Sequence, residues 1–229
     1  MPRDVGAVIV AAGAGSRLGG VPKQYRRIGG VPMALRTLRA FTAHPDVAHA
    51  VLVLPPADAA SPPEFLAGIV GAGLALAAGG AERSDSVAAG LAALAPQCRI
   101  VLVHDAARPF VSRAVIDAVI REARGGAGAV AAVPVTDTLK EAAAEDPHRV
   151  ARTMPRERLW RAQTPQGFPR ELLERAYARA RADGVHATDD AALVERIGGE
   201  VRLVPDSPSN VKITTAEDLE WAELWATRG

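Results

Sequence analysis

Four short apolar runs, separated by helix-like segments, constrain the fold of this chain more than any other feature. They are residues 5–10 (Val-Gly-Ala-Val-Ile-Val), 49–54, 99–104 and 128–133. A run without polar alternation is expected of a strand that is buried on both faces. Such strands, alternating with helices, predict an α/β fold: a mostly parallel, doubly wound sheet with helices on both faces. In these sheets ligands bind at the carboxyl ends of the strands.

The segments between these runs predict the remaining elements. We expect further strands near 74–76 and 201–204, and helices at 32–43, 63–70, 83–94, 112–124, 169–182, 189–197 and from Ala216 onward. From Pro134 to Trp160 the pattern changes to three short polar stretches, 136–141, 147–153 and 158–162. An isolated two-stranded arm is only marginally stable. We therefore expect one domain over residues 1–229, with a protruding β-arm at about 135–160 that packs on a second subunit.

Composition excludes several classes of protein. The net charge of +1 argues against a broad nucleic-acid surface. The single cysteine, Cys98, cannot form an internal disulfide, which indicates a reducing cytoplasm. No signal-peptide hydrophobic region follows Met1, and no apolar run is long enough to span a membrane. We therefore expect a cytoplasmic protein that binds small molecules and is not associated with a membrane.

A glycine-rich loop at residues 12–23 follows the first strand directly. Backbone N–H groups in such a loop can hold a phosphate. A P-loop is excluded because Val21-Pro22 follows Gly20, where that motif has Lys-Ser/Thr. A dinucleotide fingerprint, and with it a nicotinamide-dependent oxidoreductase, is disfavoured: Leu18 takes the place of the third glycine, and Leu54-Pro55-Pro56 ends the second strand without an acidic residue.

Only three of the 27 basic residues are lysines: Lys23, Lys140 and Lys212. A lysine retained against such a bias indicates a site that needs a compact ammonium rather than a planar guanidinium. Lys23 ends the glycine loop, which also contains Arg17. Two cations beside glycine amides suit a nucleoside triphosphate that is attacked at its α-phosphorus, where charge builds on the phosphoryl oxygens.

Several motifs carry a family resemblance. Residues 11–19 (Ala-Ala-Gly-Ala-Gly-Ser-Arg-Leu-Gly) with Pro22-Lys-Gln-Tyr resemble the nucleotidyltransferase signature of cytidylyltransferases with a Rossmann-like fold. The whole set, in this order, resembles the 2-C-methyl-D-erythritol 4-phosphate cytidylyltransferases; the further motifs are 79–87, 103–110, 134–140, 159–168, 188–191 and 210–219. This resemblance implies transfer of CMP from CTP to methylerythritol phosphate, with release of pyrophosphate, in non-mevalonate isoprenoid synthesis.

The resemblance also implies a role for individual residues. The catalytic set is Arg17, Lys23, Arg156 and Lys212. Asp105 would be the ligand of a divalent cation, Mg²⁺, which suits one carboxylate plus triphosphate oxygens and water. The nucleotide would contact Ala11, Ala12, Gly13, Gly15, Ser16, Gly80, Arg83, Ser86, Asp105 and Ala106. The second substrate would contact Arg108, Asp137, Thr138, Arg156, Thr164 and Lys212, and the arm would complete the site of the neighbouring subunit in a homodimer.

Alternatives remain at this level. Ser86 and Asp105 could serve as capping residues, and Lys140 and Thr164 could be structural. Another polyol phosphate, such as ribitol 5-phosphate, could be the acceptor, although the chain lacks the extra Gly and the Leu-Pro of that family's loop. An inactive homologue would have lost Arg17, Lys23, Asp105 or Lys212, and all four are present. The five histidines show no metal-site spacing, which argues against a fused cyclodiphosphate synthase domain.

Overall fold

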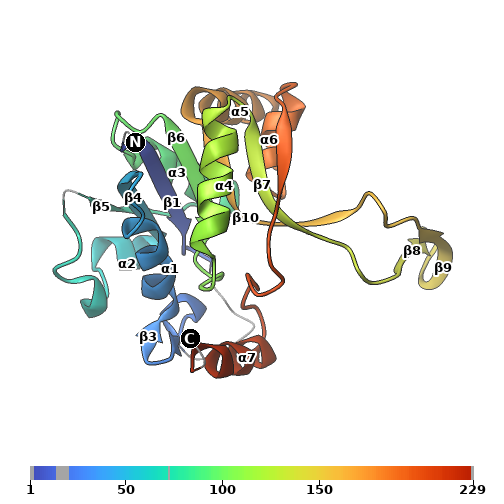
Figure 1. Cartoon of the computed structure of the whole chain (residues 1–229), viewed down its shortest axis with the longest axis horizontal. Helices are drawn as coiled ribbons and strands as arrows, with labels where there is room; N and C mark the ends of the chain where they lie inside the picture. The colour runs from blue at the N-terminus through green and yellow to red at the C-terminus, as the bar shows by residue number, and fades with distance from the viewer. Residues whose placement is uncertain (1–2, 14–20, 72, 228–229) are drawn as a thin grey trace.

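The fold is built on a seven-stranded sheet, seen in a computed structural model that describes residues 3–13, 21–71 and 73–227. The strand order is β11-β7-β10-β6-β1-β4-β5 (Figure 1). Their bounds are Val201–Pro205, Gly128–Pro134, Trp160–Pro169, Ile100–Asp105, Val5–Val10, Val47–Leu54 and Leu74–Ala78. Every pairing is parallel except the two made by β10, which runs antiparallel to both β6 and β7. The expected mostly parallel sheet is confirmed.

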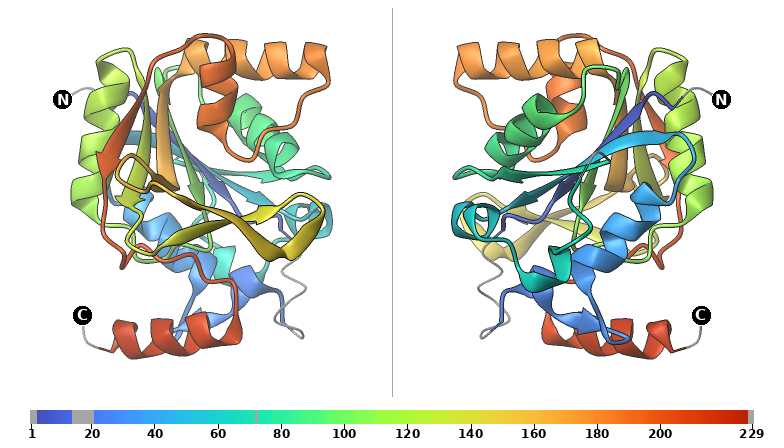
Figure 2. Two further views of the ribbon diagram at one scale, coloured as in Figure 1. Left: turned by 90° about the vertical axis from the view of Figure 1, so that its right-hand side faces the viewer. Right: turned by 90° about the vertical axis from the view of Figure 1, so that its left-hand side faces the viewer.

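Helices cover both faces of this sheet (Figure 2). On one face, α1 (Met33–Thr42) packs against β1 and β4, and α4 (Arg113–Arg124) packs against β6, β7 and β10, in a core that includes Ala7 and Ile9 of β1. On the other face, α3 (Arg83–Ala93) packs against β1, and α5 (Arg170–Asp183) and α6 (Asp190–Arg196) pack against other strands of the same core, which includes Val8. Because neighbouring residues of a strand point to opposite faces, a continuous apolar run supplies both cores.

The expected helix at 63–70 is wrong. The segment contains α2 (Pro56–Ala60) and a single 3-10 turn, η3 (Glu64–Leu66). Two consecutive prolines at 62–63 hold the chain extended before that turn, and Gly68 follows it with a φ of 81°. A helix therefore cannot continue past Leu66.

The C-terminal segment closes the fold beside the small hairpin at residues 27–32. Helix α7 (Ala216–Ala226) begins with a capping box formed by Thr215 and Asp218. It packs on the small hairpin of β2 (Arg27–Ile28) and β3 (Val31–Pro32) through a core of Ile28, Met33, Ile213 and Ala222. The rings of Trp221 and Trp225 stack 5.1 Å apart, and Trp221 meets Phe110 edge-on, so one side of α7 is a hydrophobic packing face. No described helix combines the length and hydropathy needed to cross a bilayer.

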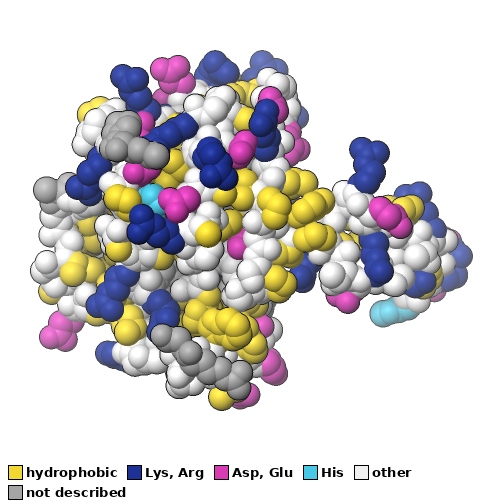
Figure 3. Space-filling model, in the orientation of Figure 1, with side chains coloured by type: hydrophobic (Ala, Val, Ile, Leu, Met, Phe, Trp, Pro, Cys, Tyr) yellow, Lys and Arg dark blue, Asp and Glu magenta, His cyan; other side chains and the backbone are white. Residues whose placement is uncertain are grey.

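An arm projects from the body as an antiparallel hairpin of β8 (Leu139–Ala143) and β9 (Asp146–Met154) (Figure 1). Its surface carries basic side chains (Figure 3), including Lys140, Arg149 and Arg152. The third polar stretch, 158–162, does not belong to the arm. From Trp160 it pairs with β7 as the start of β10, whose residues 163–168 are buried between β6 and β7. Packing of the arm on a second subunit stays a prediction.

Candidate active site

A cavity of about 420 Å³ lies at the carboxyl ends of β1 and β6. The lining residues that are predicted to bind the nucleotide come from three separate parts of the sequence. Lys23 and Lys212, the two lysines predicted to meet phosphate, also line the cavity. These lining residues include Ala11, Ala12, Gly13, Lys23, Gly80, Arg83, Ser86, Asp105, Ala106 and Lys212. Gly15, Ser16 and Arg17 lie outside the described residues. The fold thus places most of the described nucleotide site around one cavity.

Asp105 is the electrostatic centre of this cavity. Its Oδ1 accepts a hydrogen bond from Arg83 Nε at 3.2 Å, and its Oδ2 lies 2.7 Å from Lys212 Nζ. Burial raises the pKa of the Asp105 carboxyl, but the charges of Arg83, Lys212 and Arg108 outweigh burial and hold it well below its usual range. The carboxylate is therefore ionised at any pH at which the protein would work.

The end of β6 is held by a chain of buried hydrogen bonds. His104 Nε2 lies 3.0 Å from the Arg108 carbonyl, which can only accept, so Nε2 carries the proton. The Nδ1 atom then accepts from the Thr164 hydroxyl at 3.1 Å, and the same hydroxyl oxygen accepts from the Asp105 backbone N–H at 3.1 Å. Burial lowers the pKa of His104 to about 4. His104 is therefore neutral, and both of its ring nitrogens are used in hydrogen bonds that hold the end of β6.

Thr164 is buried and its hydroxyl is already used by this chain of bonds. In this arrangement it positions Asp105, which agrees with the structural alternative for this residue. Lys212 is positioned from the other side, because Ile213 N–H donates to the Ala107 carbonyl at 2.8 Å. The buried Asn210 carbonyl accepts from Arg108 Nη1 at 2.7 Å. The turn after β6 and the segment before α7 are thereby tied together.

The opposite wall of the cavity is the turn between β5 and α3. Gly80 N–H donates to Ser86 Oγ at 3.2 Å, and Ser86 Oγ donates to the Glu82 carbonyl. The helix cap itself is a box formed by Glu82 and Asp85. Ser86 is therefore not the capping residue of α3; it holds Gly80 in place. A Cβ added at Gly79 would lie only 2.3 Å from Ala12 Cβ, so this glycine lets the two walls meet closely.

The residues predicted to contact the second substrate are spread more widely. Arg108 lies beside the cavity, bonded to Asn210. Asp137 and Thr138 are exposed at the base of the arm, and Arg156 donates to the Thr136 carbonyl there. None of these three is among the residues that line the cavity of the same chain. Lys140 lies on the arm and donates to Thr153 Oγ1 at 2.7 Å, an arm-stabilising contact.

Comparison with known proteins decides the family. The model of the family 2-C-methyl-D-erythritol 4-phosphate cytidylyltransferase, or IspD, matches residues 5–228. The chain belongs to this family. The enzyme class and the function expected from the sequence are those of the family and are confirmed. A nicotinamide-dependent oxidoreductase is excluded.

The relatives of this IspD chain agree with that assignment. The 2-C-methyl-D-erythritol 4-phosphate cytidylyltransferase of Salinibacter ruber is 45% identical over 222 residues, which cover 96% of this chain and 92% of the relative. A bifunctional IspD/IspF enzyme of Solidesulfovibrio magneticus is 49% identical over 222 residues, which cover 93% of this chain and 54% of the relative. The chain therefore spans about half the length of the bifunctional relatives it matches.

Solved structures support the IspD fold. The crystal structure of 2-C-methyl-D-erythritol 4-phosphate cytidylyltransferase from Thermus thermophilus matches with a TM-score of 0.80 and 40% identity, over 96% of this chain and 98% of the other. The 4-diphosphocytidyl-2C-methyl-D-erythritol synthase of Anaerococcus prevotii matches with a TM-score of 0.85 and 29% identity, over 98% of both chains. Both likenesses extend over nearly the whole chain.

A divalent cation is generally used by this family of nucleotidyltransferases. Within the described part of the chain, no three His, Cys, Asp or Glu side chains form a group that could hold a metal. Among these described residues, two carboxylates line the cavity, Glu82 and Asp105, and Glu82 accepts from the backbone of α3 in its capping box, which leaves Asp105 as the carboxylate for a cation. One carboxylate fits a cation that takes its other ligands from a triphosphate and from water.

Sequence reasoning missed three residues around this site. Asp190, the first residue of α6, accepts from Arg83 Nη1 at 2.9 Å although it lies far along the chain. Tyr177 on α5 donates its hydroxyl hydrogen to the same carboxylate. Gly79 separates Ala12 from Ser86. Asp190 and Gly79 lie within motifs that carry the resemblance, residues 188–191 and 79–87. These motifs mark both residues, but they do not show which residues either one contacts.

Proposed function

We propose that this chain joins CMP from CTP to the phosphate of 2-C-methyl-D-erythritol 4-phosphate, with the 420 Å³ cavity as the CTP site. The observation that carries the proposal is the position of Asp105. It lies between two cations, Arg83 and Lys212, in a cavity that the glycine loop and Lys23 also line. Carboxylate, ammonium and backbone N–H groups converge there on a space where a triphosphate would lie.

The two ends of the cavity would bind different parts of the nucleotide. Gly80, Arg83 and Ser86 form the wall that would receive cytosine and ribose, with Ser86 bracing the Gly80 turn. Backbone N–H groups of residues 11–16 would hold the phosphates. Lys23, together with Arg17, would stabilise the negative charge that builds on the phosphoryl oxygens.

In the reaction, an oxygen of the acceptor phosphate forms a bond to the α-phosphorus of CTP, and the bond from that phosphorus to the bridging oxygen breaks. Pyrophosphate leaves with the electron pair. A phosphate dianion needs no general base at neutral pH, which agrees with the neutral, fully bonded His104. The protein therefore contributes alignment and charge stabilisation. Lys212 and Arg156 would position the attacking phosphate.

We propose Mg²⁺ as the divalent cation and Asp105 as the residue that would hold it. When bound, Mg²⁺ supplies positive charge to the triphosphate oxygens and orients them. Asp105 is prepared for this role because its carboxylate is ionised and its backbone N–H is fixed by a hydrogen bond to Thr164 Oγ1. Lys212 would then be free to turn toward the acceptor phosphate.

We further propose a homodimer in which the arm completes the site of the neighbouring subunit. Asp137, Thr138 and Arg156 carry the chemistry expected for the acceptor but lie at the base of the arm, outside the cavity of their own chain. The exposed strands of the arm, including Val150 with 54% of its surface exposed, would gain a packing partner. The expected cytoplasmic location stays a prediction.

The test of the reaction is release of pyrophosphate from CTP and Mg²⁺, with methylerythritol phosphate or ribitol 5-phosphate as the acceptor. We expect rapid release with the first acceptor only. Release with ribitol phosphate alone would refute the proposed substrate. Release with neither would support the inactive-homologue alternative.

Mixing two inactive variants tests the composite site. Lys212→Ala removes a residue of the cavity, and Arg156→Ala removes a residue of the arm. If the arm serves the neighbouring subunit, exchange of subunits creates dimers with one intact site, and the mixture regains activity. A mixture that stays as inactive as its components would contradict the composite site, provided that subunit exchange is shown by mass spectrometry.

A further inference from the structure

A buried carboxylate lies behind Arg83, outside the nucleotide cavity. Asp190 is fully buried, with a side-chain exposure of 0%. Its Oδ2 accepts from Arg83 Nη1 at 2.9 Å, and its Oδ1 accepts from the Tyr177 hydroxyl. Burial raises the pKa of the Asp190 carboxyl, while the charge of Arg83 and the hydrogen bonds from Tyr177 and Arg83 favour its ionised form. Burying such a charge is costly unless it is paired, and nothing in the phosphoryl transfer itself uses it.

Asp190 shares the guanidinium of Arg83 with Asp105. Arg83 gives Nη1 to Asp190 and Nε to Asp105, at 2.9 and 3.2 Å. Lys212 contacts the other oxygen of Asp105 at 2.7 Å. The two cations and two carboxylates of this group balance each other. Without Asp190, Arg83 and Lys212 would both pair with Asp105, and the group would carry one net positive charge.

We propose that Asp190 is a positioning residue that holds Arg83 back from Asp105 and so keeps enough negative charge at Asp105 to receive a divalent cation. The inference rests on the proposed function, because it takes Asp105 as the residue that holds the cation. A residue that contacts a metal ligand, but not the metal itself, commonly sets both the orientation of that ligand and its affinity for the metal. Asp190 acts in this way through Arg83.

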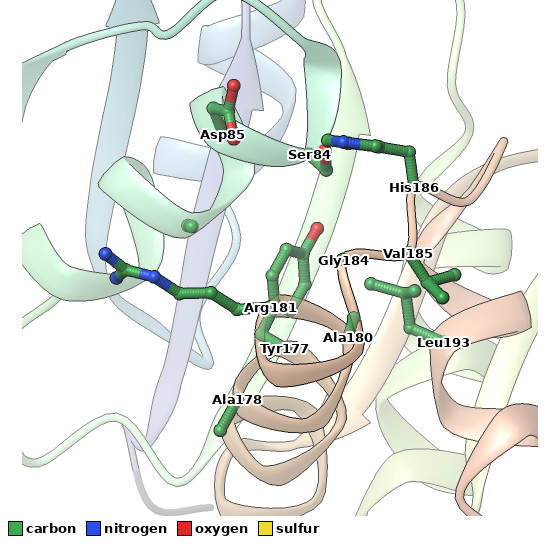
Figure 4. A pocket seen from close by; sticks show the side chains of 11 residues that line it. Ser84, Asp85, Tyr177, Ala178, Ala180, Arg181, Gly184, Val185, His186 and Leu193 are labelled. Carbon is green, nitrogen blue, oxygen red and sulfur yellow. The ribbon is translucent and has the colours of Figure 1, made fainter.

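Tyr177 supports Asp190 from α5. Its side chain rises from α5 into a cavity of about 590 Å³ whose opposite wall carries Ser84 and Asp85 of α3 (Figure 4). One side of the ring packs against the apolar core that contains Leu173, and the hydroxyl is directed by its bond to Asp190. Tyr177→Phe removes that bond and keeps the ring. It is a mild variant that weakens the hold on Asp190 without removing a buried charge.

The experiment measures Mn²⁺ binding to the protein in the presence of CTP and without acceptor, from the electron paramagnetic resonance signal of free Mn²⁺. Asp190→Asn keeps the size of the side chain and removes its charge. We expect Mn²⁺ affinity to fall at least about 10-fold, the lower end of the effect of losing such a partner. Tyr177→Phe should weaken binding in the same direction and by less.

A double variant shows whether Asp190 works through Arg83. In an Arg83→Gln background, Asp190→Asn should change Mn²⁺ affinity little further, because the competing guanidinium is already gone. Full additivity of the two substitutions would overturn the proposed route through Arg83.

Asp46→Asn is the matched control. Asp46 also accepts from an arginine, Arg124 Nη1, at 2.8 Å, and its side chain is 13% exposed. It does not line the nucleotide cavity, so this variant should lose stability and keep its Mn²⁺ affinity.

A folded Asp190→Asn protein with wild-type Mn²⁺ affinity would overturn the proposal. If that variant does not fold, Tyr177→Phe decides, and unchanged Mn²⁺ affinity in it would overturn the proposal equally. Absence of pyrophosphate release by the wild-type protein with either acceptor would refute the proposed reaction instead, while Mn²⁺ binding would still decide the role of Asp190.

Discussion

Gly79→Ala is the substitution whose effect on the nucleotide site follows most directly from the structure. The new methyl carbon would lie 2.3 Å from Ala12 Cβ, 2.8 Å from Ser86 Oγ and 3.3 Å from the Leu54 carbonyl oxygen. Carbon atoms in contact normally lie about 3.5–4.0 Å apart, so the two methyl groups must separate by more than about 1 Å. Neither can rotate away, because each is attached directly to the backbone. The glycine loop and the β5–α3 turn must therefore move apart.

The size of the effect can be worked out for stability and for catalysis separately. Overpacking of this kind costs about 1–3 kcal/mol of unfolding free energy. A displacement of about 1 Å in a group that positions substrate can cost about 100-fold in rate. We therefore expect Gly79→Ala to raise the KM for CTP and to lower kcat/KM by about 100-fold, while urea denaturation shows a folded protein of moderately reduced stability.

Gly167→Ala is the control for this prediction. A Cβ there would lie 2.4 Å from Val119 Cγ1 and 3.0 Å from Leu102 Cδ2, a similar overlap in the packing of β10 against α4. It should cost comparable stability and leave the KM for CTP unchanged. If Gly79→Ala also loses only stability, the reasoning about the cavity walls is refuted.

Three further predictions concern single side chains. Lys23→Arg should remove most turnover while the protein stays folded, because a guanidinium cannot place its charge at the same point; near-normal turnover would contradict this. Ser86→Ala should raise the KM for CTP, because the Gly80 turn loses its hydrogen bond to the Ser86 hydroxyl. An unchanged KM would show that the turn keeps its conformation without that bond. Burial lowers the pKa of His49 below 6.5. As the pH falls, His49 is therefore protonated in the unfolded chain before it is protonated in the folded protein. The stabilisation by neutral His49 is complete above pH 6.5 and is lost as the pH falls below it. The unfolding free energy of His49→Asn should therefore fall less than that of the wild type between pH 7 and 5, and parallel pH curves for the two proteins would contradict the prediction.

The arrangement of the core was predictable because it depends on local patterns. The apolar runs at 5–10, 49–54, 99–104 and 128–133 became β1, β4, β6 and β7, and the helices between them lie close to their expected bounds. The helix expected at 63–70 failed where two prolines and a glycine with positive φ opposed the apolar residues between them. The sequence pattern groups the stretch at 158–162 with the arm, whereas its backbone from Trp160 onward pairs with β7 in the main sheet.

The candidate site also has one part that the sequence predicts and another that only the structure shows. The glycine loop, Lys23 and Asp105 could be placed from the sequence, since each follows a recognisable strand and parallel strands bring their carboxyl ends to one edge of the sheet. The contacts among Arg83, Asp105, Asp190 and Lys212 could not. These four residues belong to α3, β6, α6 and the segment before α7, and only the packed fold brings them within hydrogen-bond distance.

The sequence by itself thus determined the fold class and the family, because periodicity and motif spacing are local properties of the chain. The tertiary structure alone decided that β10 enters the sheet antiparallel, that Thr164 is occupied in holding Asp105, and that Arg83 is shared between two carboxylates. These facts depend on which groups satisfy the hydrogen bonds and charges of one another once they are buried, and that choice is made only when distant segments pack together.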